Sequence, residues 1–199
     1  MRSGRPREFD IDEVLDQAMR VFWQHGYEGA ALSDLTSAMG INRPSLYAAY
    51  GNKESLFEQA LDRYSEQVAG YAREALEQPT AREVVEHLLR GAAQATTSRG
   101  RPKGCLTVQG ALACGPNGEV ARAQLTRWRH AAEASIRARL RRGQQDGDLP
   151  ETADPAELSR YVATMVHGIS VQAAGGTSRA ALLRTVEMTM VAWDALTAT

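Results

Sequence analysis

The sequence predicts an all-α protein of about nine helices, and three observations predict this class. Alanine is abundant, apolar residues recur at three- and four-residue steps, and no run of alternating β-branched residues indicates a strand. The 199 residues are 43% hydrophobic and 24% charged, which is the balance of a globular protein that buries its own core.

Start and stop patterns mark the first helix and the two short helices that follow it. Asp10 and Glu13 form a capping-box pattern before the first helix, and Gly26 lies where that helix should end. Ser33 is a suitable N-cap for a short helix over 34–39. A second short helix is expected between an asparagine cap and a glycine stop, Asn42 and Gly51.

Six further helices are expected in the rest of the chain. The first of them is long, follows the cap Asn52 and runs over 53–77. Turns rich in glycine, proline and polar residues separate the other five helices. We expect these helices over 81–97, 105–113, 119–142, 155–174 and 178–196.

The two short helices lie three residues apart around Gly40, behind the longer first helix. This is the arrangement of a helix-turn-helix, in which the second short helix enters the major groove of DNA and the first crosses the backbone. Polar side chains on the second short helix are expected to point outward as donors: Arg43, Ser45, Tyr47 and Tyr50. The segment from Ser33 to Lys53 is therefore the candidate DNA-binding unit.

Charged residues and helix ends around this unit support the same interpretation. The helix N-termini at Ser33 and Asn52 offer free N–H groups to phosphate, and Lys53 adds a cation at the second one. A basic arm that can reach a neighbouring groove precedes the first helix, with Arg2, Arg5 and Arg7. The net charge of −1 neither indicates nor excludes DNA, because binding depends on where the charges lie.

The sequence lacks the motifs of an enzyme or a metalloprotein. None of its four histidines lies at metal-ligand spacing from another His or Cys, and no HExxH motif, phosphate-binding glycine loop or nucleophile elbow is present. We therefore expect no catalytic residue, no metal and no cofactor. The polar N-terminus and the charges that interrupt every apolar run predict a cytoplasmic protein without a membrane partner.

From Asp10 to Phe57 the sequence resembles the N-terminal domain of TetR/AcrR-type bacterial transcriptional regulators. The likeness is strongest in three runs, Ser45-Leu46-Tyr47, Gly51-Asn52-Lys53-Glu54 and Leu56-Phe57. The sequence departs from the family pattern at two places on the expected recognition surface, Asn42-Arg43-Pro44 and Ala48-Ala49. The operator sequence of other members therefore does not transfer to this chain.

The resemblance implies a homodimeric repressor that a small-molecule effector releases from an inverted-repeat operator. Residues 1–52 would form the helix-turn-helix DNA-binding domain, and residues 53–199 a helical effector-binding and dimerisation domain. The helix over 53–77 joins the two domains and is the expected lever between them. By position, Tyr47 and Lys53 would contact phosphate, Arg43, Ser45 and Tyr50 would lie in or beside the major groove, and Ser33 and Thr36 would touch the DNA backbone.

The last two helices carry more apolar residues than one core face requires, which predicts dimerisation through them. Two such helices from each subunit would pack as a four-helix interface. The alternative is that each helix is central in its own domain and buries both faces there. The residues expected at the interface are Leu158, Tyr161, Val162, Met165, Ile169, Leu182, Leu183, Val186, Met190 and Trp193.

An effector site is expected among the helices of the C-terminal domain. Its candidate residues are polar or aromatic side chains on otherwise apolar faces: Tyr64, Tyr71, Gln109, Trp128, Met165, His167 and Gln172. The effector would favour the conformer whose two recognition helices are wrongly spaced for DNA.

Two other functions remain open from the sequence. A thiol-redox-sensing regulator would use Cys105 and Cys114, but these lie nine residues apart on one short expected helix and could not pair without melting it. Buried small apolar residues are the favoured interpretation of both cysteines. A helical protein-interaction module without DNA binding would have no need of the basic arm, Tyr47 or Lys53.

Overall fold

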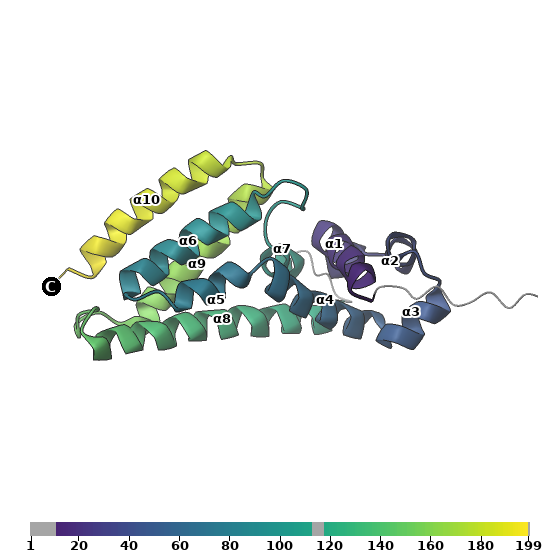
Figure 1. Cartoon of the computed structure of the whole chain (residues 1–199), viewed down its shortest axis with the longest axis horizontal. Coiled ribbons are helices and arrows are strands. Elements are labelled where there is room, and N and C mark those ends of the chain that lie inside the picture. The colour runs from purple at the N-terminus through teal and green to yellow at the C-terminus, as the bar shows by residue number, and fades with distance from the viewer. Residues whose placement is uncertain (1–10, 113–117, 199) are drawn as a thin grey trace, which may run out of the picture.

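The computed structural model describes residues 11–112 and 118–198, and within these ranges it contains ten α-helices and no strand (Figure 1). The predicted all-α class is confirmed. The helices are α1 Ile11–Gly29, α2 Leu32–Met39, α3 Arg43–Tyr50, α4 Lys53–Gln67, α5 Gly70–Leu76, α6 Ala81–Thr96, α7 Leu106–Leu112, α8 Glu119–Asp146, α9 Pro155–Ala174 and α10 Arg179–Leu196.

The tenth helix arises because the segment expected as one helix over 53–77 is two helices. The N–H groups of Val68 and Ala69 both bond to the carbonyl of Tyr64, at 2.9 and 3.1 Å. The second bond spans five residues instead of four, and this wider turn ends α4. Val68 is β-branched and buried, and Gly70 follows it at the start of α5. Both residue types have low helix propensity, so the chain bends here at little cost.

Several helix ends agree with the expected ones and others do not. Gly26 has φ 68°, so α1 kinks where the sequence predicted its end, although the helical segment continues to Gly29. Ser33 is not the cap of α2, because the N-cap position is Ala31. The expected capping residue Asp10 lies outside the described residues. The side chains of five N-cap residues each accept a backbone hydrogen bond, and the sequence predicted the first two of these caps: Asn42, Asn52, Thr80, Asp154 and Ser178.

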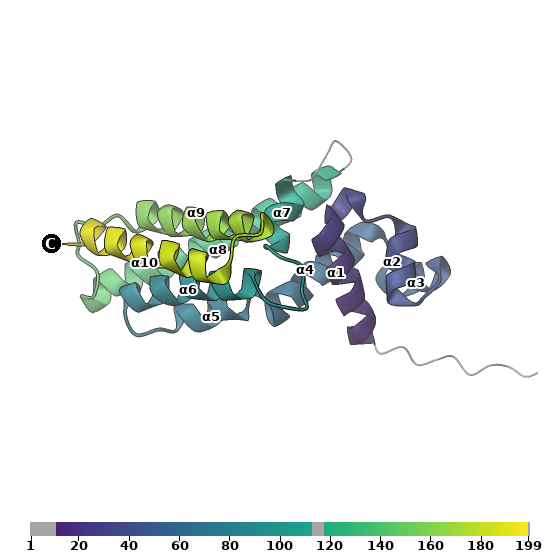
Figure 2. The ribbon, with the colours of Figure 1, turned by 90° about the horizontal axis from the view of Figure 1, so that it is seen from above.

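The molecule is elongated, with α1, α2 and α3 gathered at one end and α5, α6, α9 and α10 at the other (Figures 1 and 2). Helix α4 leads from the first group to the second, and the long helix α8 runs beneath the second group toward α4 (Figure 1). Helix α7 lies at the junction. No helix in the described ranges is long and apolar enough to cross a membrane.

Each end of the molecule has its own hydrophobic core. The first core joins α1, α2, α3 and α4, with Leu106 of α7 and Leu125 of α8 added from the other end. At its centre the ring of Phe22 packs edge-on against that of Phe57, with centroids 5.0 Å apart. The second core lies among α5, α6, α8, α9 and α10 and includes Trp193, which is 1% exposed. Because α7 and α8 enter the first core, the two ends share packed surface.

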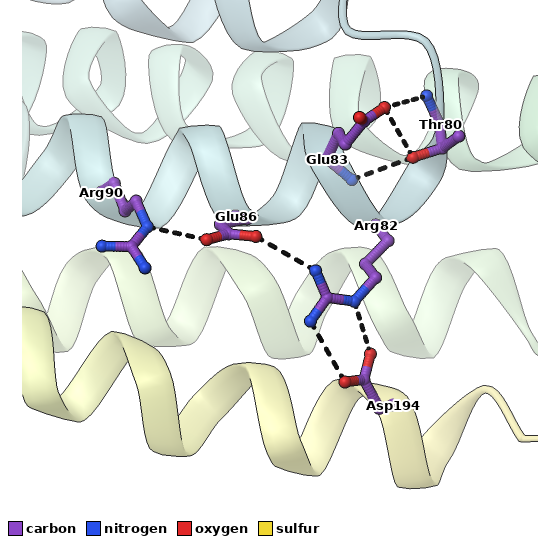
Figure 3. Close-up of polar contacts among 6 residues, drawn as sticks. All are labelled: Thr80, Arg82, Glu83, Glu86, Arg90 and Asp194. Atoms are coloured by element: carbon purple, nitrogen blue, oxygen red, sulfur yellow. Dashed lines mark hydrogen bonds and ion pairs between the residues drawn. The ribbon is translucent and has the colours of Figure 1, made fainter.

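A chain of surface ion pairs joins α6 to α10 (Figure 3). Nε and Nη2 of Arg82 donate to the carboxylate of Asp194 at 2.8 and 3.2 Å, and Nη1 donates to Glu86 at 3.1 Å. At the start of α6, Thr80 and Glu83 form a capping box. Exposed ion pairs contribute about 1 kcal/mol or less, so the buried Trp193 holds α10 more firmly than these contacts do.

Candidate nucleic-acid interface and effector cavity

Helices α2 and α3 form the predicted helix-turn-helix around Gly40. Gly40 has φ 65°, the left-handed region that glycine favours, and its N–H bonds to α2 carbonyls. The Oδ1 of Asn42 then accepts the N–H of Ser45 at 2.9 Å and starts α3. Leu35 and Leu46 are fully buried, which holds both short helices against the first core.

The outer face of α3 is open to solvent. Arg43, Ser45 and Tyr47 are exposed, as the sequence predicted, and Tyr47 is 45% exposed although it is aromatic. Ala48 and Ala49 lie beside them and are also exposed. Their small side chains leave the helix backbone close to any surface that α3 meets. This face therefore carries hydrogen-bond donors, and its small alanine side chains allow the close approach that a helix in the major groove requires.

The outward orientation expected for Tyr50 is wrong. Tyr50 is 5% exposed and belongs to the first core. It follows the buried Leu46 by four residues, and residues at this spacing share one face of a helix. Burial, together with the charge of Asp12, raises the pKa of the Tyr50 hydroxyl. Tyr50 therefore packs inside the first core and is not part of the recognition surface.

The two candidate residues on α2 differ in how their hydroxyl groups are used. Ser33 is exposed. Thr36 is half-buried, and its hydroxyl donates to the carbonyl of Leu32 at 2.9 Å within the helix. Contacts of either residue with the DNA backbone remain predictions. Because phosphate oxygens only accept hydrogen bonds, Thr36 would have to turn its hydroxyl proton away from the Leu32 carbonyl to make one.

Lys53 lies at the start of α4, with its Nζ 4.6 Å from the centroid of the Tyr27 ring. A cation over an aromatic face is attracted by the ring quadrupole, so this contact favours the position of the ammonium group over the Tyr27 ring. Partial burial lowers the pKa of Lys53, while Glu28 and Glu54 act in the opposite direction. The predicted cation is thus held beside the α4 N-terminus. The basic arm of Arg2, Arg5 and Arg7 lies outside the described residues.

A cavity of about 300 Å³ lies between α4, α5, α7, α8 and α9. Four of the residues predicted for an effector site line it, namely Tyr64, Tyr71, Trp128 and His167. Apolar side chains form much of the remaining wall, among them Leu88, Val108 and Ile136. The volume is at the lower end of the range of small-molecule sites. The cavity is therefore suited to a compact ligand with an apolar body.

Three predicted effector residues lie elsewhere, which corrects that part of the prediction. The side chain of Gln109 packs over Gly104, where a Cβ atom would lie 2.7 Å from its amide. Met165 packs against the second core. Gln172 is exposed on α9, and its Oε1 accepts from the Thr177 hydroxyl at 3.3 Å. The sequence identified polar or large side chains on the correct helices but not the face that each one occupies.

The polar part of the cavity wall was not predicted. It includes Arg129 and Glu133 on α8 and Cys105 just before α7. Arg129 and Glu133 follow Trp128 on the same helix, so the expected inward position of Trp128 indicated the region. Small alanine side chains, Ala131, Ala132 and Ala163, also line the space. Which small residues leave a cavity depends on how helices pack, and this has no signature in the sequence.

Three groups in the cavity have altered protonation behaviour. Burial, followed by the charge of Arg129, lowers the pKa of His167, while Glu133 partly offsets this, so the imidazole is neutral at pH 7. Burial raises the pKa of the Tyr64 hydroxyl well above its usual value, and neighbouring Cys105 adds to the effect. The pKa of the Tyr71 hydroxyl is raised for the same two reasons. Both tyrosines are therefore neutral donors.

Most residues expected at a dimer interface are core residues of the single chain. Val162, Val186 and Trp193 are at most 1% exposed, and the remaining members are buried or packed against the second core. The alternative, that these helices are central in their own domain, is correct for this face. The large apolar side chains that α9 and α10 do expose are Val171, Met188, Val191 and Leu196.

Contacts between the two ends run through α1, α4 and the loop before α7. The Tyr64 ring lies edge-on to that of Trp23, with centroids 4.9 Å apart. Nε of Arg63 donates to Asp16 at 2.7 Å. Burial acts to raise the pKa of Asp16, but the bonds from Arg63 and Gln67 outweigh it and lower the pKa. Nη1 of Arg20 donates to the carbonyl of Gly100, which fastens the loop to α1.

A helix-turn-helix on its own core, presenting an open second helix and joined to a helical body with a cavity, defines the class of helix-turn-helix transcriptional regulators. Residues 14–60 match the profile of "Bacterial regulatory proteins, tetR family", and residues 79–189 match "Tetracyclin repressor-like, C-terminal domain". The chain belongs to the tetR family. Members of this family are transcriptional regulators and act as dimers.

Individual relatives agree with this placement along nearly the whole chain. The HTH-type transcriptional repressor ComR of Escherichia coli (strain K12) is 34% identical over 197 residues, which cover 97% of this chain and 93% of ComR. The HTH-type transcriptional repressor BdcR of the same strain is 30% identical over 187 residues, 93% of this chain and 89% of BdcR.

A solved structure extends the likeness to three dimensions. A cysteine mutant of the TetR family transcriptional regulator CifR, complexed with 26 bp double-strand operator DNA, superposes with a TM-score of 0.90 at 47% identity. The match covers 95% of this chain and 100% of that chain. The predicted family and the predicted function class are confirmed, and the redox-sensor and interaction-module alternatives are not favoured.

Proposed function

We propose that this protein is a homodimeric repressor that binds an inverted-repeat operator and that a small molecule in the cavity releases it. The observation that carries the proposal is the outer face of α3, where Arg43, Ser45 and Tyr47 are exposed on a helix whose inner face is fully buried. Side chains held on a rigid element keep the geometry that base readout requires.

Each exposed residue has a role that its chemistry suggests. Arg43, in the first turn of α3, is suited to bidentate contact with guanine, and Ser45 to a base edge or phosphate beside it. Tyr47 is suited to donate its hydroxyl to phosphate. Lys53 lies at the N-terminus of α4, where its charge and the free N–H groups favour a second phosphate.

We infer the same two functional domains that the sequence suggested, 1–52 for DNA binding and 53–199 for effector binding and dimerisation. Helix α4 serves both. Its residues Leu56 and Phe57 are fully buried in the first core, while Tyr64 near its other end lines the cavity. A shift of α4 in response to a ligand would therefore move the DNA-binding domain.

We propose that the dimer forms through the outer faces of α9 and α10. Met188 and Val191 on α10 are 74% and 72% exposed, and Val171 on α9 is 46% exposed. Met188 and Val191 lie three residues apart, so they share one face of the helix. Figure 1 shows α10 on the outer side of the helical body, where a second copy can approach. An interface of this kind pairs the same surface on both subunits.

Release follows from a difference in affinity between two conformers. The ligand would bind more tightly to the conformer in which the two α3 helices are wrongly spaced for successive major grooves. A differential affinity of a few kcal/mol is sufficient to shift the population usefully. The contact of Tyr64 with Trp23 provides a direct route from the cavity to α1.

The protein acts in this proposal by binding alone, in the cytoplasm where chromosomal DNA is accessible, with no catalytic residue, metal or cofactor. Cys105 is half-buried, and its Sγ lies 3.0 Å from the Thr107 hydroxyl, so it is a constituent of the cavity wall. The other cysteine of the redox alternative, Cys114, lies outside the described residues.

A gel-shift experiment with genomic fragments at two salt concentrations tests the proposal. The full-length protein should retain a fragment that contains an inverted repeat, and its affinity should fall steeply with salt as counterions are released. Arg43→Ala should lose the specific complex. Arg141→Ala is the matched control, because Arg141 is exposed near the C-terminal end of α8. That end of α8 lies at the opposite end of the molecule from α3 (Figure 1). Equal retention of all fragments, or retention that Arg43→Ala leaves unchanged, contradicts the proposal.

A further inference from the structure

The cavity has the size of a small ring-bearing ligand. An apolar cavity of about 150 Å³ accommodates a benzene ring, so about 300 Å³ has room for one ring and a chain of comparable bulk. Three aromatic side chains, Tyr64, Tyr71 and Trp128, line it from three different helices. Aromatic walls on several sides favour a planar ring over a flexible aliphatic chain.

The charged groups around the cavity do not balance one another. Arg73 and Arg129 both line it, against one carboxylate, Glu133. Glu133 already faces a cation of its own, because Nε of Arg160 lies 3.8 Å from its Oε1. His167 is neutral at pH 7 because burial and Arg129 lower its pKa. The wall therefore has an excess of positive charge.

Of the two cations, Arg73 is exposed to solvent, so Arg129 is the better placed to pair with a ligand inside the cavity. It is half-buried, and the one hydrogen bond recorded for it among the described residues runs from Nη2 to the Thr126 hydroxyl at 3.2 Å. A guanidinium has five N–H donors in a planar fork, which matches a carboxylate bidentately. Elsewhere on the cavity wall, the Cys105 Sγ lies 3.0 Å from the Thr107 hydroxyl, so these two polar groups already have each other as partners.

We propose that the effector is a small aromatic carboxylate, whose ring lies among Tyr64, Tyr71 and Trp128 and whose carboxylate pairs with Arg129. This inference rests on the proposed function and adds the chemical class of the ligand. Burial of the ring provides affinity, and the ion pair with Arg129 provides discrimination against neutral and cationic analogues. Loss of the carboxylate leaves the guanidinium facing an apolar ligand without a partner.

Calorimetric titration of the full-length protein with three compounds of matched shape tests the inference. The probes are phenylpropionate, phenylpropionamide and phenylpropylamine, which carry a negative, a neutral and a positive end group on one scaffold. The wild-type protein should bind phenylpropionate about tenfold or more tightly than the amide, because charge-assisted pairs are the stronger ones. The amine should bind most weakly.

Two arginine variants on α8 locate the discriminating group. Arg129→Gln should bind the acid and the amide within about twofold of each other, because glutamine keeps a polar amide but loses the charge and the guanidinium fork. Arg127→Gln is the matched control and should keep the wild-type preference, since Arg127 is exposed and does not line this cavity. Thermal unfolding of both variants near the wild-type temperature confirms that they are folded.

Four results overturn the inference. The first two are equal binding of acid and amide by the wild type, and a preference that survives in Arg129→Gln. The third is tightest binding of the amine, which would assign the dominant role to Glu133, and the fourth is failure of all three probes to bind. The gel shift with genomic fragments is independent of these titrations. A protein that retains its operator while showing no preference for the acid refutes the ligand class and leaves the repressor function standing.

Discussion

The ring of Tyr64 on α4 packs edge-on against the ring of Trp23 on α1, with centroids 4.9 Å apart. Tyr64 also lines the cavity, so one side chain touches both the ligand space and the first helix of the DNA-binding end. Tyr64 and Trp23 are both at most 4% exposed. Because packed interiors have few alternative arrangements, displacement of Tyr64 by a ligand moves Trp23 as well.

Trp23→Phe should weaken the response to ligand without abolishing either binding activity. The smaller ring keeps an apolar core but retracts from Tyr64, so less of the ligand-induced shift reaches α1. Coupling energies of this type are about 1–3 kcal/mol, and we expect the variant to reduce the ligand-induced loss of operator affinity several-fold. The measurement is the operator Kd with and without a releasing ligand. A wild-type response in Trp23→Phe contradicts this route.

Substitutions of Tyr47 and Tyr50 should have separate effects, the first on operator affinity and the second on the free energy of unfolding. Tyr47→Phe removes one exposed hydroxyl, which should lower operator affinity by about 3- to 10-fold and change the free energy of unfolding by less than about 0.5 kcal/mol. Tyr50→Ala removes a buried ring, which should destabilise the protein by about 3 kcal/mol. Urea unfolding and operator titration of both variants check the pair. The reverse pattern would place Tyr50 on the recognition surface.

Gly91→Ala should destabilise the protein and disturb the cavity. A Cβ atom on Gly91 would lie 2.4 Å from Cδ2 and 2.9 Å from Cβ of Tyr71, so rotation of the ring does not relieve the clash and α5 must move away from α6. Overpacking of this kind costs about 1–3 kcal/mol, measured by thermal unfolding.

The matched control for this change is Gly70→Ala, where an added Cβ meets no atom within 4 Å. It should leave stability unchanged or raise it by up to about 1 kcal/mol, because alanine restricts the unfolded chain. Since Tyr71 lines the cavity, ligand affinity should fall in Gly91→Ala and persist in Gly70→Ala. Equal effects of the two changes would show that the close contact between Gly91 and Tyr71 is unimportant.

Met188→Asp should convert the dimer to a monomer with a folded body. Met188 is 74% exposed on α10, so the single chain loses little packing, whereas a carboxylate buried between two copies lacks a partner. Val120→Asp is the control, because Val120 is 54% exposed at the start of α8 and so belongs to neither α9 nor α10. Sedimentation equilibrium distinguishes the two. A dimeric Met188→Asp protein would place the interface on another surface.

The sequence predicted the helices well because their signals are local. Caps such as Asn42 and Asn52 act within one turn of the chain, and the apolar spacing around Leu46 and Phe57 shows which face of each helix is buried. Tyr50 shows the limit of such reasoning. Its type is suited to a DNA contact, but its four-residue spacing from Leu46 places it in the core.

Features that depend on packing between distant helices were not predicted correctly. The apolar residues of α9 and α10 were sufficient to cover two faces, yet the structure buries most of them within one chain and leaves Met188 and Val191 outside. The cavity is similar, since Arg129 faces it only because α8 lies against α4 and α5 in one particular rotation. Periodicity defines one helix face at a time and does not state which neighbour covers it.

Hydroxyl-radical footprinting of the full-length protein on its retained genomic fragment tests the central claim most directly. We expect two protected half-sites related by inversion, with centres separated by about 34–36 Å or a multiple of that distance, because a symmetric dimer presents two α3 helices to successive major grooves. Arg43→Ala should weaken protection in both half-sites equally. A single unsymmetric protected patch, or symmetric protection that Arg43→Ala leaves intact, would contradict the account.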